Sequence, residues 1–231
     1  MDELKRNKKK QMAALCCGLL GCLCFGTGDW LMMCADPTPL GELYWLTAGT
    51  AQIPPWRYTL AMVLAFPGIL LYGTALFSLE RYILLSKQKN TYHTLTVYGL
   101  TPWLCLHLFY VMILFAFGWM QNHGYAAAAL PTCEALYRQF SWLPAVSEVL
   151  MVPPFLYWFY LQMKGETVFP KPMAFISVLV FYGVLYLVKS LLPISAFRLG
   201  FTNGLMSESM LLWFCVLLLW TARKTAGNGK P

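Results

Sequence analysis

Six long apolar segments divide the chain, and they constrain its fold more than any other feature of the sequence. They run over residues 12–34, 58–79, 98–120, 141–163, 172–194 and 204–222. Each is close to the roughly 20 residues that a helix needs to cross the hydrocarbon core of a bilayer. A lone strand would leave its backbone groups unpaired there, and the alternating pattern of a membrane β-barrel is absent from the sequence. The sequence therefore predicts an all-α polytopic membrane protein, a bundle of six transmembrane helices.

The composition excludes the main soluble classes. Hydrophobic residues make up 58% of the 231 residues and charged residues only 12%, against about 45–50% and about 25% in a typical soluble domain. Disorder requires low hydrophobicity, and a soluble globule would lack the polar residues to cover its surface. We expect a basic N-terminus over 1–11, the six-helix domain over 12–222 and a short tail over 223–231.

The basic residues lie mainly between the apolar segments and favour one side. Thirteen of the 17 Lys and Arg residues fall in the N-terminus, the second and fourth connections and the C-terminus. Arg57, Arg138 and Arg198 fall on the opposite side, and Lys189 lies inside a segment. The positive-inside rule then predicts a multi-pass protein of the cell membrane with both termini in the cytoplasm. Because the basic residues form no phosphate-binding face, nucleic acid is not an expected partner.

Several ionisable side chains are predicted to share one layer near the outer ends of the segments. Such residues cost about 2.5–3.5 kcal/mol each inside a membrane helix and usually face a partner or a wet cavity. They lie about four to six residues from those ends, or roughly 6–9 Å deep, with two arginines beside them. The set is Asp29, Arg57, Glu148, Lys189, Arg198 and Glu208. Two interpretations stay open: an outward-facing ligand pocket, or ion pairs that only fix the packing. In either case we expect Lys189 to pair with at least one carboxylate.

Prolines interrupt the segments near the same layer. Pro153 and Pro154 follow Glu148, and Pro193 is predicted to free the carbonyl of Lys189, since proline lacks an N–H and clashes with the carbonyl four residues back. Broken helices at membrane depth are tolerated where they line a cavity or are packed by protein. His107, near the middle of the third segment, is either a proton relay to this layer or a packing histidine.

The eight cysteines do not predict a metal site. Four of them crowd the first segment without the paired knuckles typical of zinc sites, so we expect packing residues, no metal and no cofactor. Cys34 and Cys133 both fall on the predicted outer side, where a disulfide or two free thiols are open alternatives. The sequence before Cys22 is similar to a bacterial lipoprotein cleavage site, but the apolar run continues to about Ala35, so we expect the helix to be retained.

The Gly28-Asp29 pair that ends the first segment, together with six segments and little else, resembles an uncharacterised bacterial family of small multi-pass membrane proteins. The resemblance covers most of the chain. It implies a multi-pass membrane fold and carries no activity with it.

Three functions fit these features. The preferred one is the binding or translocation of a small polar or amphiphilic molecule. The first alternative is an intramembrane enzyme acting on a lipid or small molecule, with Asp29, Glu148 or Glu208 as acid or base and Lys189 as an electrostatic stabiliser. The second is a structural or sensory subunit. The expected partners are the lipid bilayer and a small-molecule or lipid ligand, and the oligomeric state stays open.

Overall fold

A computed structural model of the chain describes residues 2–37 and 53–227, and these residues are folded almost wholly into helices. Within those ranges there is no β-strand, and one isolated bridge joins Ile83 to Thr167. The predicted all-α class is therefore confirmed. The helices are α1 Asp2–Met33, α3 Pro55–Ser78, α4 Ser86–Leu95, α5 Thr101–Asn122, α6 Ala126–Phe140, α7 Trp142–Lys164, α8 Val178–Leu191 and α9 Ala196–Gly227.

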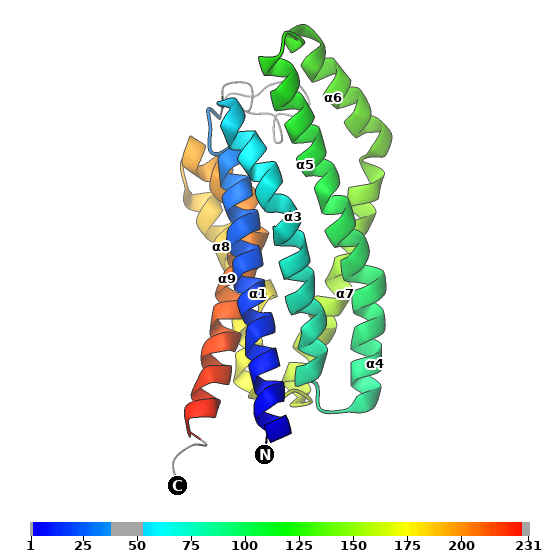
Figure 1. Cartoon of the computed structure of the whole chain (residues 1–231), viewed down its shortest axis with the longest axis vertical. Helices are drawn as coiled ribbons and strands as arrows, with labels where there is room; N and C mark the ends of the chain where they lie inside the picture. Colours follow the sequence, from blue (N-terminus) through cyan, green and yellow to red (C-terminus); the bar gives the residue numbers. More distant parts are fainter. Residues whose placement is uncertain (1, 38–52, 228–231) are drawn as a thin grey trace.

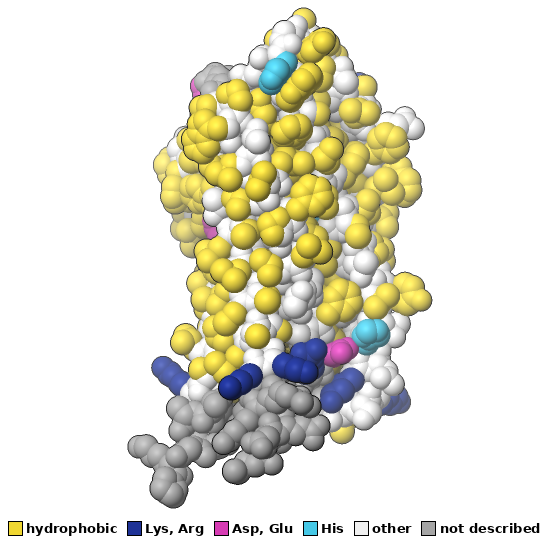
Figure 2. All heavy atoms as spheres, in the orientation of Figure 1, with side chains coloured by type: hydrophobic (Ala, Val, Ile, Leu, Met, Phe, Trp, Pro, Cys, Tyr) yellow, Lys and Arg dark blue, Asp and Glu magenta, His cyan; other side chains and the backbone are white. Residues whose placement is uncertain are grey.

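The helices run up and down along one long axis (Figure 1). α1 and the joined α4 and α5 run in one direction, whereas α3, α9 and the consecutive α6 and α7 run in the other. α1 begins and α9 ends at the same end of the bundle, where Lys and Arg side chains also gather (Figure 2). We call this the basic end, defined by Arg81, Lys87, Lys164, Lys171 and Arg223, and the opposite end the far end.

The sides of the bundle are strongly apolar (Figure 2). Four helical stretches are long and apolar enough to cross a membrane: Lys9–Met33, Pro55–Tyr82, Ser86–Asn122 and Ala196–Arg223. They correspond to the first, second, third and sixth predicted segments. Their outer faces expose large apolar side chains, and Leu70, for example, is 72% exposed. A surface of this kind is typical of a protein that contacts lipid rather than water.

Four predicted segments have different bounds in the structure. The segment 12–34 lies within the longer α1, which begins at Asp2. The segment 98–120 continues a helix that begins at Ser86, because a π-helical turn over Thr96–Leu100 joins α4 to α5 without a break. The segment 172–194 is not one helix: a 3₁₀-helix, Lys171–Ile176, ends at Ser177, whose extended backbone precedes α8. The segment 204–222 lies within the longer α9.

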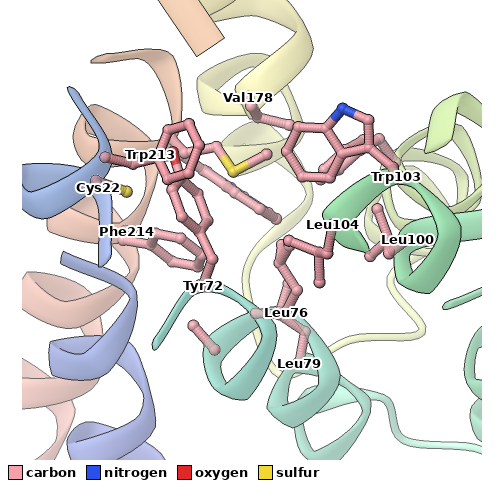
Figure 3. Packing of buried hydrophobic residues seen from close by; sticks show 14 of the residues in the cluster. Cys22, Tyr72, Leu76, Leu79, Leu100, Trp103, Leu104, Val178, Trp213 and Phe214 are labelled. Atoms are coloured by element: carbon pink, nitrogen blue, oxygen red, sulfur yellow. The ribbon is translucent and has the colours of Figure 1, made fainter. Parts of the chain in front are cut away.

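α1 packs against both α3 and α9, and two small residues allow the close approach. A Cβ at Gly18 would lie 2.7 Å from the Cβ of Ala75, and one at Gly21 would lie 2.8 Å from the backbone nitrogen of Tyr72. Tyr72 of α3 and Phe214 of α9 belong to the buried cluster in Figure 3. Leu15 is also fully buried, so cleavage before Cys22 would remove part of this core.

The prolines affect the helices less than predicted. α7 continues through Pro153 and Pro154. α8 ends before Pro193, and the N–H of Leu192 donates to the carbonyl of Lys189 at 3.2 Å, so the prediction of a freed carbonyl at Lys189 is wrong. The proline lies beyond the end of the helix and therefore does not interrupt it.

Candidate binding cleft

Three adjoining cavities form a cleft in the half of the bundle nearer the far end. His107 of α5 and Asn203 of α9 line all three, Asp29 of α1 lines two, and Glu148 of α7 also lines two. The two larger cavities have volumes of about 470 and 310 Å³. Four separate helices therefore contribute a polar side chain to one hollow region of an otherwise apolar bundle.

Asp29 lies in the seam between α1 and α9. The Ser207 hydroxyl donates to its Oδ2 at 3.5 Å, which is at the long limit of a hydrogen bond. Asp29 forms no ion pair with any residue that the structure describes. One weak hydrogen bond leaves most of the hydrogen-bonding capacity of this carboxyl group open to the cleft.

Glu148 lies near the start of α7, on the opposite wall. It shares the 310 Å³ cavity with Tyr182 of α8, and both side chains are exposed. α8 packs mainly against α9 rather than against α7. The cleft therefore opens sideways between α7 and α8.

His107 both packs and lines the cleft. Its ring centroid lies 4.8 Å from that of Phe25 and 5.4 Å from that of Trp103. The same ring also lines all three cavities of the cleft. The packing interpretation thus accounts for the faces of the ring, while a role as a proton relay stays a prediction.

The basic residues of the predicted layer bind elsewhere. Arg57 Nη2 donates to the carbonyls of Trp30 at 3.2 Å and Cys34 at 2.9 Å. Arg198 Nη1 donates to the carbonyl of Leu192 at 2.9 Å. These arginines satisfy carbonyls at helix ends, where the helix dipole favours positive charge.

Lys189 does not form the expected ion pair with a carboxylate of the described residues. Its Nζ lies 4.7 Å from the centroid of the Tyr186 ring, one turn earlier on α8. A cation–π contact on its own helix therefore takes the place of a partner on another helix.

Glu208 faces a different cavity from Asp29. Its Oε1 accepts a hydrogen bond from Trp30 Nε1 at 2.9 Å, and both residues line a groove of about 340 Å³ between α1 and α9. Gly204 leaves room for this contact, since a Cβ there would lie 3.0 Å from the same oxygen. The structure thus brings Asp29, Glu148 and His107 together around the cleft, whereas Glu208 lines the neighbouring groove.

The eight cysteines are all free thiols in the structure. Cys133 is buried beside Ile113, Phe117 and Ala129, and burial raises the pKa of its thiol. Cys34 follows the end of α1, and the alternative of a disulfide between Cys34 and Cys133 is not realised in this structure. Nowhere in the described part of the chain do three His, Cys, Asp or Glu side chains lie close enough to hold a metal ion.

A known family model matches nearly the whole chain. The model of a family of unknown function, DUF6796, matches residues 1–224. The chain belongs to this family. No curated protein and no solved structure matches the chain. The DUF6796 match spans every helix that lines the cleft.

Sequence reasoning missed several polar residues of the cleft. Asn203 and Ser207 are four residues apart, so they lie on one face of α9. This spacing in an apolar helix was available as a signal, but the predicted segment began one residue after Asn203. Tyr137 and Ser141 lie near the junction of α6 and α7 and also line the largest of the three cavities, and no periodicity in the sequence points to them.

Proposed function

We propose that this DUF6796 protein is a multi-pass cell-membrane protein whose cleft opens outward and binds or translocates a small polar or amphiphilic molecule. In this proposal six helices span the membrane and both termini are cytoplasmic. Besides the four long apolar stretches, α7 and α8 expose apolar side chains: Val149 is 70% and Leu187 is 66% exposed. Both helices are therefore suited to contact lipid.

One observation carries the proposal: the polar cleft is closed towards the basic end by packed aromatic rings. Trp213 of α9 lies 6.3 Å from Phe155 and 6.1 Å from Trp158, both of α7, measured between ring centroids. Trp158 and Trp213 are at most 1% exposed. A basic end in the cytoplasm would make this closure the inner one. The cleft would then be accessible from the outer side or from the outer leaflet.

The positions of the charged groups support a ligand cleft over ion pairs that only fix the packing. A purely structural cluster requires its acids and bases to meet, because that is how the cost of burying them is offset. Here the bases bind carbonyls or a ring, and the two cleft carboxylates stay unpaired among the described residues. A cleft that accepts a ligand explains this arrangement.

Thiol accessibility in intact cells tests the proposal. Ala145→Cys places a thiol in the largest of the three cavities, and Ser86→Cys places one at the start of α4, at the basic end. We expect a membrane-impermeant methanethiosulfonate to label Ala145→Cys above the level of the parent chain. Ser86→Cys should be labelled only after the cells are permeabilised. Labelling of Ser86→Cys in intact cells, or protection of Ala145→Cys, would contradict an outward-facing cleft.

A further inference from the structure

The charge of the cleft has a single sign. Among the described residues that line the three cavities, Asp29 and Glu148 are the acidic side chains, and no Lys or Arg lines any of them. The nearby arginines use their guanidinium groups on the carbonyls of Trp30, Cys34 and Leu192. A ligand in the cleft therefore meets two carboxyl groups and no opposing positive side chain of the described chain.

These carboxyl groups lack a partner that offsets their cost. Asp29 accepts one long hydrogen bond, from the Ser207 hydroxyl. Glu148 has no hydrogen bond or ion pair among the described residues. Carboxylates at membrane depth are costly unless they are paired or solvated. A positively charged group in the cleft would supply the missing partner from outside the chain.

The remaining lining suits an organic cation. Trp103, Tyr137 and Tyr182 present aromatic rings, and rings of this kind attract quaternary and other organic cations through their faces. Apolar side chains such as Val111 and Leu114 complete the wall of the largest of the three cavities. Volumes of about 470 and 310 Å³ are in the range of small-molecule sites. The opening between α7 and α8 gives such a molecule a route from the lipid.

We propose that the cleft selects hydrophobic organic cations over anions of the same size, with Asp29 and Glu148 as the recognition residues. This inference rests on the proposed function and names its ligand class. The positive charge lies between the walls formed by α1 and α7, and the apolar body packs on the aromatic and aliphatic lining.

Tetraphenylphosphonium and tetraphenylborate test this proposal because they have the same shape and opposite charge. Purified protein in detergent is titrated with each ion, and binding is measured by equilibrium dialysis. We expect saturable binding of tetraphenylphosphonium and far weaker binding of tetraphenylborate. Asp29→Asn should weaken tetraphenylphosphonium binding by about tenfold or more, as expected when one partner of a desolvated charge pair is removed. Glu148→Gln should weaken it in the same direction.

Glu208→Gln is the matched control. Glu208 follows Ser207 on α9, but its carboxylate faces the groove and bonds to Trp30. It should leave tetraphenylphosphonium binding unchanged. Size-exclusion profiles and thermal stability show that each variant is folded, and the two conservative substitutions at separate sites keep the test interpretable if one of them fails to fold.

Three results would overturn the selection of cations: equal binding of both ions, no saturable binding of tetraphenylphosphonium by monodisperse protein, or a loss in Glu208→Gln as large as in the cleft variants. None of these contradicts an outward-facing cleft if Ala145→Cys is labelled from outside. Conversely, charge-selective binding together with a protected Ala145→Cys would leave the cation site in place and contradict its proposed orientation.

Discussion

Arg57 illustrates how a charged side chain is accommodated near the end of an apolar helix. Its Nη2 lies 3.2 Å from the carbonyl oxygen of Trp30 and 2.9 Å from that of Cys34. The last carbonyls of a helix have no partner within the helix, and positive charge there is favourable. Arg57 therefore links the start of α3 to the end of α1. One of its partners, Trp30, directly follows Asp29 in the sequence.

Replacing Arg57 should lower the stability of the protein. Arg57→Gln removes hydrogen bonds with a charged donor, which contribute about 1.5–3 kcal/mol to the free energy of unfolding. We expect a lower Tm in detergent, measured by intrinsic tryptophan fluorescence. Arg138→Gln is the control, because the Arg138 side chain is 61% exposed and lies 3.9 Å from Glu134, and pairs with a partner at the surface contribute at most about 1 kcal/mol. Equal Tm values for Arg57→Gln and the parent would show that this contact is not stabilising.

Lys189 should behave differently. Since its Nζ lies over the Tyr186 ring at 4.7 Å, Lys189→Met should reduce the free energy of unfolding by only about 0.5–1 kcal/mol, the contribution of an exposed cation–π contact. Double variants with Asp29→Asn, Glu148→Gln or Glu208→Gln should then be additive in Tm. A double variant more stable than Lys189→Met alone would indicate an ion pair in solution that the structure does not contain.

The chemical type of a residue and its depth in an apolar segment can both be predicted from a sequence, and these two properties define the candidate site residues. Asp29, Glu148 and His107 indeed meet around one cleft. The partners of Lys189 and Arg57 were not readable, because segment positions fix the height of a residue along the bundle but not the direction of its side chain. Lys189 lies at the expected height and still turns back along its own helix.

At the scale of the helices, the π-helical turn over Thr96–Leu100 fits closely against α7. A Cβ at Gly99 would collide with the carbonyl oxygen of Leu150 and lie 3.0 Å from Cγ of Pro154. Pro154 lacks the N–H that would normally bond to this carbonyl, so the carbonyl faces a neighbouring helix instead. The prolines of α7 thus help to position the wall that carries Glu148.

Gly99→Ala should separate these two helices and destabilise the protein. Forcing a methyl group into a packed contact typically costs about 1–3 kcal/mol. Gly183→Ala is the matched control, because Gly183 is also within a helix and a Cβ there would meet nothing within 4 Å. Its free energy of unfolding should be unchanged or raised by up to about 1 kcal/mol through helix propensity. If both variants melt at the same temperature, the close contact at Gly99 does not limit the packing.

The helices themselves were predictable to different degrees. Hydrophobic runs located α3 and the end of α1 closely, because a continuous apolar stretch and a helix coincide there, whereas α1 begins ten residues before the apolar run, at Asp2. The extension of the third segment back to Ser86 was not predictable, since α4 is polar and its helical state depends on packing, with Tyr92 buried in the core. The split before α8 comes at Ser177, whose extended backbone follows a 3₁₀-helix that packs mainly against α7.

At the scale of the whole molecule, charge and folding direction agree. The up-and-down order of the helices places the start of α1 and the end of α9 at one end, and most of the Lys and Arg residues gather there (Figures 1 and 2). The hairpin between α5 and α6 lies at the far end. Folding direction and charge are independent features, because the direction follows from the order of the helices and the charge from the residues of the connections.

Reporter fusions in cells should therefore read opposite sides of the membrane. A reporter after Pro231 should be cytoplasmic, since the basic connections at that end are retained inside. A reporter inserted near Ala128, at the start of α6, should be exterior, because α6 begins at the far end. A third reporter after Lys171 serves as an internal control and should match the first, as it lies in a basic connection between α7 and α8. An exterior reading after Pro231, or a shared reading at Pro231 and Ala128, would contradict six spans with cytoplasmic termini and would also reverse the side from which a ligand reaches Asp29 and Glu148.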